Sequence, residues 1–191
     1  PDEGGAGEAW KSLATDPDQM GELFEGFVLG YLKCRLGSNT RVHAPLLDWD
    51  CQAAPGSSTA MLPVMRTDVC VERRASSAQI IECKFYQTPF VEHRWGVEEK
   101  VRSKHLYQLL AYLRAGERRW EMRPEGMLLY AATGTAVDED WTLEGFAVRV
   151  RTLDLSREWN ALEGDLERLA RGWHGGARHA RYGIAVDDTE P

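Results

Sequence analysis

Apolar residues in three segments of the chain recur every three or four positions, which is the spacing of one helix face. The pattern predicts helices at about 18–36, 97–115 and 156–171. Gly37 follows the first segment directly and is a natural helix stop. The polar positions of these segments should therefore face solvent, and the apolar stripes should pack on a common core.

Short runs rich in β-branched and aromatic residues predict strands at 41–49, 64–71, 80–86, 126–132 and 145–155. In the second run Val69 and Val71 alternate with more polar residues, which predicts a strand with two different faces. The segment 75–77 is a small turn of hairpin length, so the runs 64–71 and 80–86 should pair antiparallel. The element order α-β-β-β-α-β-β-α predicts an α/β fold, with a mixed central sheet flanked by helices.

Length and composition set the domain organisation. A chain of 191 residues predicts one domain, which we place at 18–172, between a flexible lead-in at 1–17 and a flexible tail at 173–191. No apolar run approaches the ~20 residues of a membrane helix, and no signal peptide is visible. The four cysteines form no C-x-x-C pair. We therefore expect a cytoplasmic protein with reduced thiols, no zinc site and no membrane partner.

Three charged residues converge on the predicted hairpin. Glu82 and Lys84 are two positions apart and so share one strand face, and Asp68 on the neighbouring strand can reach that face. Two carboxylates are ligands that Mg²⁺ prefers, and a nearby lysine can polarise water or stabilise developing negative charge. From the residues alone, solvated charges on an exposed hairpin are an equally good interpretation.

The net charge of −7 argues against a simple polyanion-binding protein. The charge is unevenly distributed, because the segment 60–123 holds twelve Lys and Arg against eight Asp and Glu. This local basic excess coincides with the candidate site and suits a substrate that carries phosphate.

The sequence T-D-V, followed on the next strand by E-C-K, resembles the motif of the PD-(D/E)xK nucleases. Gln108 and Tyr112, in Q-L-L-A-Y, are similar to the Q-x-x-x-Y element of RecB-like members. Glu25, in L-F-E-G-F, matches the acid of the upstream helix in such enzymes. Thr67 departs from the pattern, because it stands where the motif has its proline.

The order and spacing of four segments resemble the C-terminal nuclease domain of the McrC family over roughly residues 20–155. The segments are L-F-E-G-F-V, L-P-V-M-R-T-D-V, I-I-E-C-K-F-Y and K-V-R-S-K-H-L-Y-Q-L-L-A-Y-L. The resemblance implies an endonuclease that cuts double-stranded DNA as the cleavage subunit of a 5-methylcytosine-specific restriction system. It also implies activation by an McrB-like AAA+ GTPase ring, bound through an N-terminal domain that we expect to be absent from this chain.

The resemblance assigns roles to single residues. Asp68, Glu82 and the Cys83 carbonyl are expected to hold Mg²⁺, for which Mn²⁺ substitutes, and Lys84 to assist the attacking water. Glu25 and Gln108 complete the expected catalytic set, although a boundary acid and a helix-surface cap are open alternatives. The expected DNA contacts, for which a solvated helix face or core packing is the alternative, are Arg66, Lys100, Arg102, Lys104, His105 and Tyr112.

An alternative function follows from the same motif. A chain that keeps the nuclease fold as an inactive remnant would bind DNA or regulate a partner without cutting. The complete set of Asp68, Glu82 and Lys84 favours the active enzyme.

Overall fold

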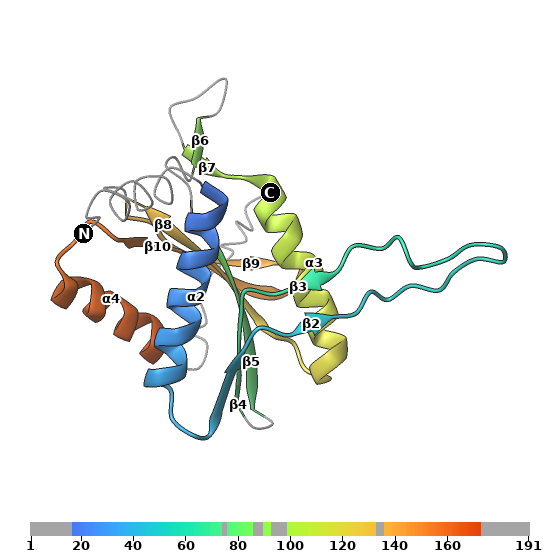
Figure 1. Ribbon diagram of the computed structural model, residues 1–191, viewed down its shortest axis with the longest axis horizontal. Helices are drawn as coiled ribbons and strands as arrows, with labels where there is room; N and C mark the ends of the chain where they lie inside the picture. The colour runs from blue at the N-terminus through green and yellow to red at the C-terminus, as the bar shows by residue number, and fades with distance from the viewer. Residues whose placement is uncertain (1–16, 74–75, 86–89, 93–98, 133–135, 173–191) are drawn as a thin grey trace, which may run out of the picture.

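A six-stranded mixed sheet forms the centre of the protein (Figure 1). The computed structural model describes residues 17–73, 76–85, 90–92, 99–132 and 136–172. The predicted lead-in and tail lie outside these residues, apart from Pro17. In spatial order the strands are β1 (Thr40–His43), β4 (Val69–Arg73), β5 (Ser77–Phe85), β8 (Glu125–Ala132), β10 (Phe146–Asp154) and β9 (Asp138–Leu143).

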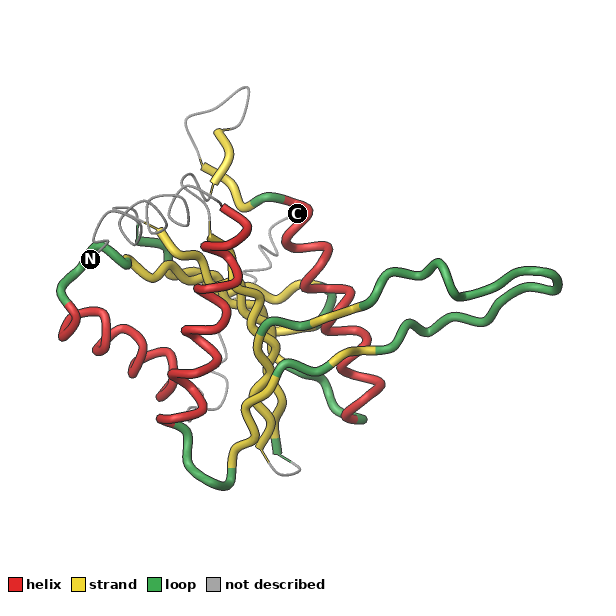
Figure 2. Tube along the Cα trace, in the orientation of Figure 1, coloured by secondary structure: helices red, strands yellow, loops and turns green. Residues whose placement is uncertain are grey.

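Strands β5, β8 and β10 run parallel, and the outer strands β1, β4 and β9 are antiparallel to their neighbours. Helices cover both faces of the sheet: α2 (Pro17–Arg35) and α4 (Trp159–Gly172) lie on one side, and α3 (Ser103–Trp120) lies on the other (Figures 1 and 2). The predicted α/β class and the antiparallel hairpin of β4 and β5 are confirmed.

The core has two apolar clusters, one on each face of the sheet. Phe24, Val28 and Leu32 of α2 pack on one face, and Leu109 and Leu113 of α3 pack on the other. Val69 and Val71 of β4 pack in one cluster and Cys70 packs in the other, so the two different faces predicted for this strand are confirmed. Both faces are covered at these three residues, which are all buried.

Two predicted strands are each divided in the structure. The run 41–49 forms β1 and then β2 (Leu46–Leu47), because the intervening Pro45 has no N–H to donate to a ladder. The run 64–71 forms β3 (Met65–Arg66) and then β4, and β2 pairs with β3 in a separate two-stranded sheet. Thr67 stabilises the division: its backbone N and its Oγ1 both donate to the Pro45 carbonyl, at 3.3 and 2.9 Å.

Helix α3 starts six residues later than predicted and ends five residues later. The start is displaced because β7 (Glu99–Val101) pairs with β6 (Phe90–Glu92), so the chain is extended just before the helix. Gly116 does not end the helix. A Cβ atom at that position would lie 2.4 Å from the ring of Trp120, so glycine allows the last turn to pack closely.

The edge strand β9 was not predicted. Its sequence is D-E-D-W-T-L, whose charges hide the strand pattern. Glu144 and Gly145 form the tight turn to β10 with φ angles of 50° and 82°. A Glu-Gly pair before an apolar run is the signal that the sequence offered for this hairpin.

A long arm, residues 48–64, projects from the body of the protein between β2 and β3 (Figures 1 and 2). Trp49 Nε1 donates to the Pro63 carbonyl at 2.5 Å and joins the two limbs of the arm. Arg118 and Arg119 of α3 donate to carbonyl groups at its base. The arm and its base carry large exposed apolar side chains: Leu46, Trp49, Met61, Leu62 and Val64.

None of the described helices has the length and apolar content required to cross a bilayer.

Candidate active site

The hairpin of β4 and β5 brings the two predicted metal carboxylates together. Val69 pairs with Ile81, so Asp68, which directly precedes β4, lies beside the end of β5 that carries Glu82. The backbone N–H of Cys83 donates to Asp68 Oδ2 at 2.8 Å. This bond fixes the Asp68 side chain against the neighbouring strand.

Lys84 lies on the same strand as Glu82. Asp68, Glu82 and Lys84 together form a cluster that we call the carboxylate constellation. Lys84 Nζ lies 2.5 Å from Glu82 Oε1. The Glu82 side chain is only 1 % exposed and that of Lys84 is 15 % exposed. The other Glu82 oxygen, Oε2, is buried and has no hydrogen-bond partner among the described residues. A buried carboxylate oxygen of this kind is costly unless a further donor or cation occupies the site.

Burial controls the charge of the acids in this constellation. Desolvation raises the pKa of Asp68 to about 8, and repulsion from Glu82 and Glu25 adds to the rise, while Lys84 and the Cys83 N–H oppose it. Desolvation also raises the pKa of Glu82 and of Glu25, against the attraction of Lys84. The pKa of each of the three acids is thus raised, so a bound cation, which favours the charged carboxylates, would stabilise the folded site.

The residues present fit a magnesium ion. Asp68 and Glu82 supply hard carboxylate oxygens, and the buried Glu82 Oε2 is available as a ligand. Within the described ranges, no group of three or more His, Cys, Asp or Glu side chains is arranged to hold a metal. The role of the Cys83 carbonyl as a third ligand stays a prediction.

Two helices bring the other predicted catalytic residues to the same place. Glu25 of α2 is close enough for its charge to raise the pKa of Asp68 and Glu82. Gln108 Nε2 of α3 donates to Tyr112 Oη at 3.1 Å. The pKa of the Tyr112 hydroxyl is raised, first by burial and then by the nearby acids, although its bond from Gln108 acts in the opposite direction. These positions agree with the predicted set, and the individual roles stay predictions.

The predicted DNA contacts fall into two groups. Arg66, Lys100 and Lys104 are exposed, and Arg102 is half-buried. The charge of Arg66 lowers the pKa of Glu25, so Arg66 lies close to the constellation. Tyr112 is buried at 8 % exposure. Its predicted DNA contact stays a prediction.

His105 is the clear correction among these residues. It is 2 % exposed, so it has no surface with which to contact the DNA backbone, and that prediction is wrong. Its Nδ1 lies 2.8 Å from the hydroxyl of Tyr130 on β8. Burial lowers the pKa of His105 to about 4, and the charge of Lys84 adds to this effect. The available sequence signal was its spacing of three residues from Gln108, which places both on one face of α3.

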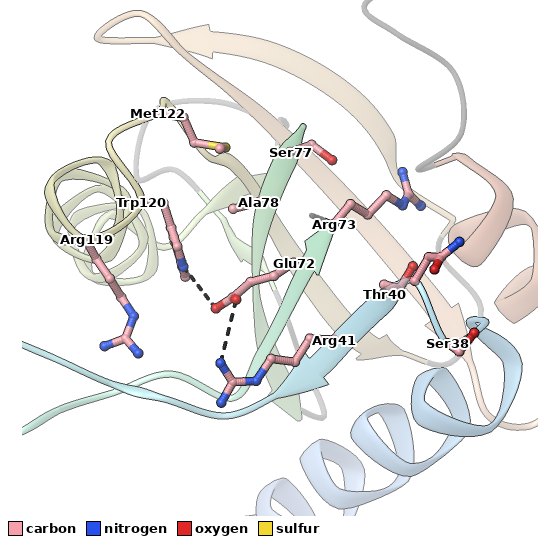
Figure 3. Close-up of a pocket in the computed structure, with 11 residues that line it drawn as sticks. Ser38, Thr40, Arg41, Glu72, Arg73, Ser77, Ala78, Arg119, Trp120 and Met122 are labelled. Carbon is pink, nitrogen blue, oxygen red and sulfur yellow. Dashed lines mark hydrogen bonds and ion pairs between the residues drawn. The ribbon is translucent and has the colours of Figure 1, made fainter. Parts of the chain in front are cut away.

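A cavity of about 700 Å³ lies at the other end of β5 (Figure 3). Glu72 lines it and accepts a hydrogen bond from Trp120 Nε1 at 2.9 Å, and Arg41 lies 3.9 Å away. The lining residues include Arg73 and Arg119 but none of the predicted catalytic residues. The carboxylate constellation is therefore separate from this cavity.

Comparisons with known proteins add one relative and one solved structure. The type IV methyl-directed restriction enzyme EcoKMcrBC of Escherichia coli (strain K12) is 30% identical over 154 residues, which cover 78% of this chain and 41% of the relative. The chain thus spans about two fifths of the length of that relative. A refined half-complex from the tetradecameric assembly of Thermococcus gammatolerans McrB AAA+ hexamers with bound McrC aligns with a TM-score of 0.49 and 13% identity, over 78% of this chain and 32% of that chain. No family model matches.

Proposed function

We propose that this chain, a relative of McrC as its motifs predicted, is the metal-dependent endonuclease domain of a modification-dependent restriction enzyme. The observation that carries the proposal is the cluster of Asp68, which directly precedes β4, with the buried Glu82 and the partly buried Lys84 on the adjacent strand β5. The description of the relative as a methyl-directed restriction enzyme supports DNA as the substrate. The mixed sheet with helices on both faces is consistent with a PD-(D/E)xK core.

Asp68 and Glu82 would hold Mg²⁺, with the Cys83 carbonyl as a further ligand. The bound ion supplies Lewis-acid stabilisation of negative charge on the scissile phosphate. Lys84, held by Glu82 at 2.5 Å, orients the attacking water and stabilises the charge that develops on the phosphate oxygens. Glu25 and Gln108 border the same site and would orient the water or the lysine.

Basic side chains near the constellation would hold the DNA. We expect Arg66, Lys100, Arg102 and Lys104 to contact backbone phosphates, and such contacts fix the position of a duplex without reading its sequence. We therefore expect recognition of the methylated base, and activation by GTP, to come from an McrB-like partner ring.

A plasmid-cleavage assay with Mg²⁺ or Mn²⁺ tests this proposal. Wild type, Lys84→Ala and the control Lys33→Ala, an exposed lysine at the end of α2, are compared with and without the McrB-like partner and GTP. We expect Lys84→Ala to lose cleavage roughly 100-fold or more, since charge stabilisation is lost, and Lys33→Ala to match wild type.

The fold of each variant is checked by circular dichroism. Full cleavage by Lys84→Ala would contradict the role of that lysine. Tight DNA binding by wild type without cleavage under any condition would instead support the inactive DNA-binding module.

A further inference from the structure

We propose that His105 and Tyr130 form a positioning pair for Lys84, confining its side chain so that the ammonium group points to Glu82. The inference rests on the proposed nuclease function and adds two residues to its machinery. Tyr130 is paired across the sheet with Lys84 and not with an expected metal ligand, so the pair would act on the reaction through the lysine.

The pair lies beside Lys84 on the side opposite to Asp68. In the parallel ladder of β5 and β8, Tyr130 is the register partner of Lys84, so the two side chains lie next to each other on one face of the sheet. His105 reaches the same place from α3, and its Nδ1 lies 2.8 Å from Tyr130 Oη. Lys84 is thus flanked by Tyr130 on one strand and approached by His105 from the helix above.

A buried polar pair in this position needs an explanation. Tyr130 is 0 % exposed and His105 is 2 % exposed, and the surrounding core of Leu109, Leu113 and Leu128 is apolar. Apolar side chains would fill the same space without the desolvation of an imidazole and a hydroxyl. Among the described residues the buried polar or charged side chains are few, and two of them, Glu82 and His105, border Lys84. Their grouping around one lysine indicates a role in the site.

The chemistry of imidazole suits a support for an ammonium group. A neutral imidazole carries one donor and one acceptor nitrogen, so it can bond the Tyr130 hydroxyl without adding a positive charge beside Lys84. The low pKa of His105 agrees with a neutral ring. Lysine has a flexible four-carbon stem and rotatable donors, so its ammonium group is directed only if neighbours confine the stem. Glu82 binds the ammonium group of Lys84, and the pair of His105 and Tyr130 would restrict the conformation of its four-carbon stem.

Conservative variants of the full chain test the pair. His105→Phe and Tyr130→Phe keep the rings and remove the hydrogen bond, and His105→Asn keeps a polar atom near the position of Nδ1. Tyr107→Phe is the matched control, because Tyr107 lies on the same helix and is 71% exposed. The kcat and KM of Mg²⁺-dependent DNA cleavage are measured together with the melting temperature of each variant.

We expect kcat to fall about ten-fold or more in His105→Phe and Tyr130→Phe with KM little changed, since a misdirected lysine affects the reaction rather than DNA binding. The double variant should lose no more than the more severe single variant, because the two residues act as a unit. His105→Asn should recover part of kcat. The positioning role would be contradicted if kcat stayed within two-fold of wild type in both phenylalanine variants. It would also be contradicted if the losses of kcat followed the losses of melting temperature and His105→Asn recovered no activity.

A second measurement is independent of cleavage. The ¹⁵N chemical shifts of the His105 ring are compared between wild type and Lys84→Met, with Lys33→Met as control. We expect a change only in Lys84→Met, and unchanged shifts would overturn the coupling of the pair to the lysine. If wild type fails to cut but the shifts respond to Lys84→Met, the nuclease function fails while the coupling stands.

Discussion

At the scale of single residues, burial decides the charge state of the candidate site. Asp68 has an ordinary carboxyl pKa of 3.8 in a solvated chain, and the folded protein raises it to about 8. The rise comes first from desolvation and then from repulsion by Glu82 and Glu25. The folded state therefore binds this proton more tightly than the unfolded state does. Without metal, its stability should fall as pH rises between these two values.

Asp68→Asn should remove this pH-dependent loss. Asparagine has nearly the same shape and no charge, so the metal-free variant should melt at least about 3 °C above wild type at pH 8. Near pH 4.5 the difference should be small, because Asp68 is protonated in the folded protein there. Thermal unfolding in a chelator at both pH values measures the effect, with the exposed Asp48→Asn as control. An equal gain at both pH values would contradict the explanation.

At the scale of elements, the boundary between β3 and β4 positions the site. Thr67 is fully buried, and its Oγ1 donates to the Pro45 carbonyl and lies 3.4 Å from Cys70 Sγ. Thr67 directly precedes Asp68, so these contacts fix the chain at the start of β4 against Pro45 and Cys70. The arm, unlike Thr67, should contribute little to the stability of the fold. Its large apolar side chains are exposed and so gain little free energy from burial.

Shortening the arm should therefore leave the stability of the body nearly unchanged. Replacing residues 51–60 with a short Gly-Ser turn keeps the bond from Trp49 to Pro63 and the contacts of Arg118 and Arg119. We expect a change in melting temperature below about 2 °C, since a shorter loop alters closure entropy only slightly.

Thr67→Val is the comparison for the shortened arm. It is nearly isosteric but removes one of the two hydrogen bonds from Thr67 to the Pro45 carbonyl, which costs about 0.5–1.5 kcal/mol. We expect a decrease of several degrees in melting temperature. If the shortened arm destabilises the protein as much as Thr67→Val does, the arm has a structural role that its exposure does not indicate.

At the scale of the whole molecule, the acidic net charge and the buried acids oppose the metal-free fold. The acids come from α2, from the residue before β4 and from β5, so the charge repulsion acts between parts of the chain that folding brings together. A cation at Asp68 and Glu82 would therefore stabilise the packed molecule and not one element alone.

Mg²⁺ should raise the melting temperature of the wild-type protein. At ten times the dissociation constant the expected rise is about 3–6 °C. Glu82→Gln should abolish the rise, whereas Glu72→Gln, at the acid of the remote cavity, should retain it. The measurement is thermal unfolding across a Mg²⁺ titration. A wild-type protein whose melting temperature does not respond at millimolar Mg²⁺ would argue against a metal site on these carboxylates.

The sequence by itself determined the α/β class, the hairpin of β4 and β5, and the grouping of Asp68, Glu82 and Lys84. These features depend on local rules: side chains two apart on a strand share a face, and a short turn pairs adjacent strands antiparallel. The same rules did not reveal β9, whose charged residues mask the strand pattern, or the division of two strands at Pro45 and Thr67.

Only the tertiary structure decided which of these residues are buried. The packing of α3 on the sheet buries His105 against Tyr130, which lies 25 residues away in the chain. The helices on both faces bury Val69, Cys70 and Val71 of β4, and desolvation shifts the pKa of the preceding Asp68. Burial depends on contacts between distant segments, so spacing along the sequence predicted that Asp68, Glu82 and Lys84 lie together but not how far each is buried.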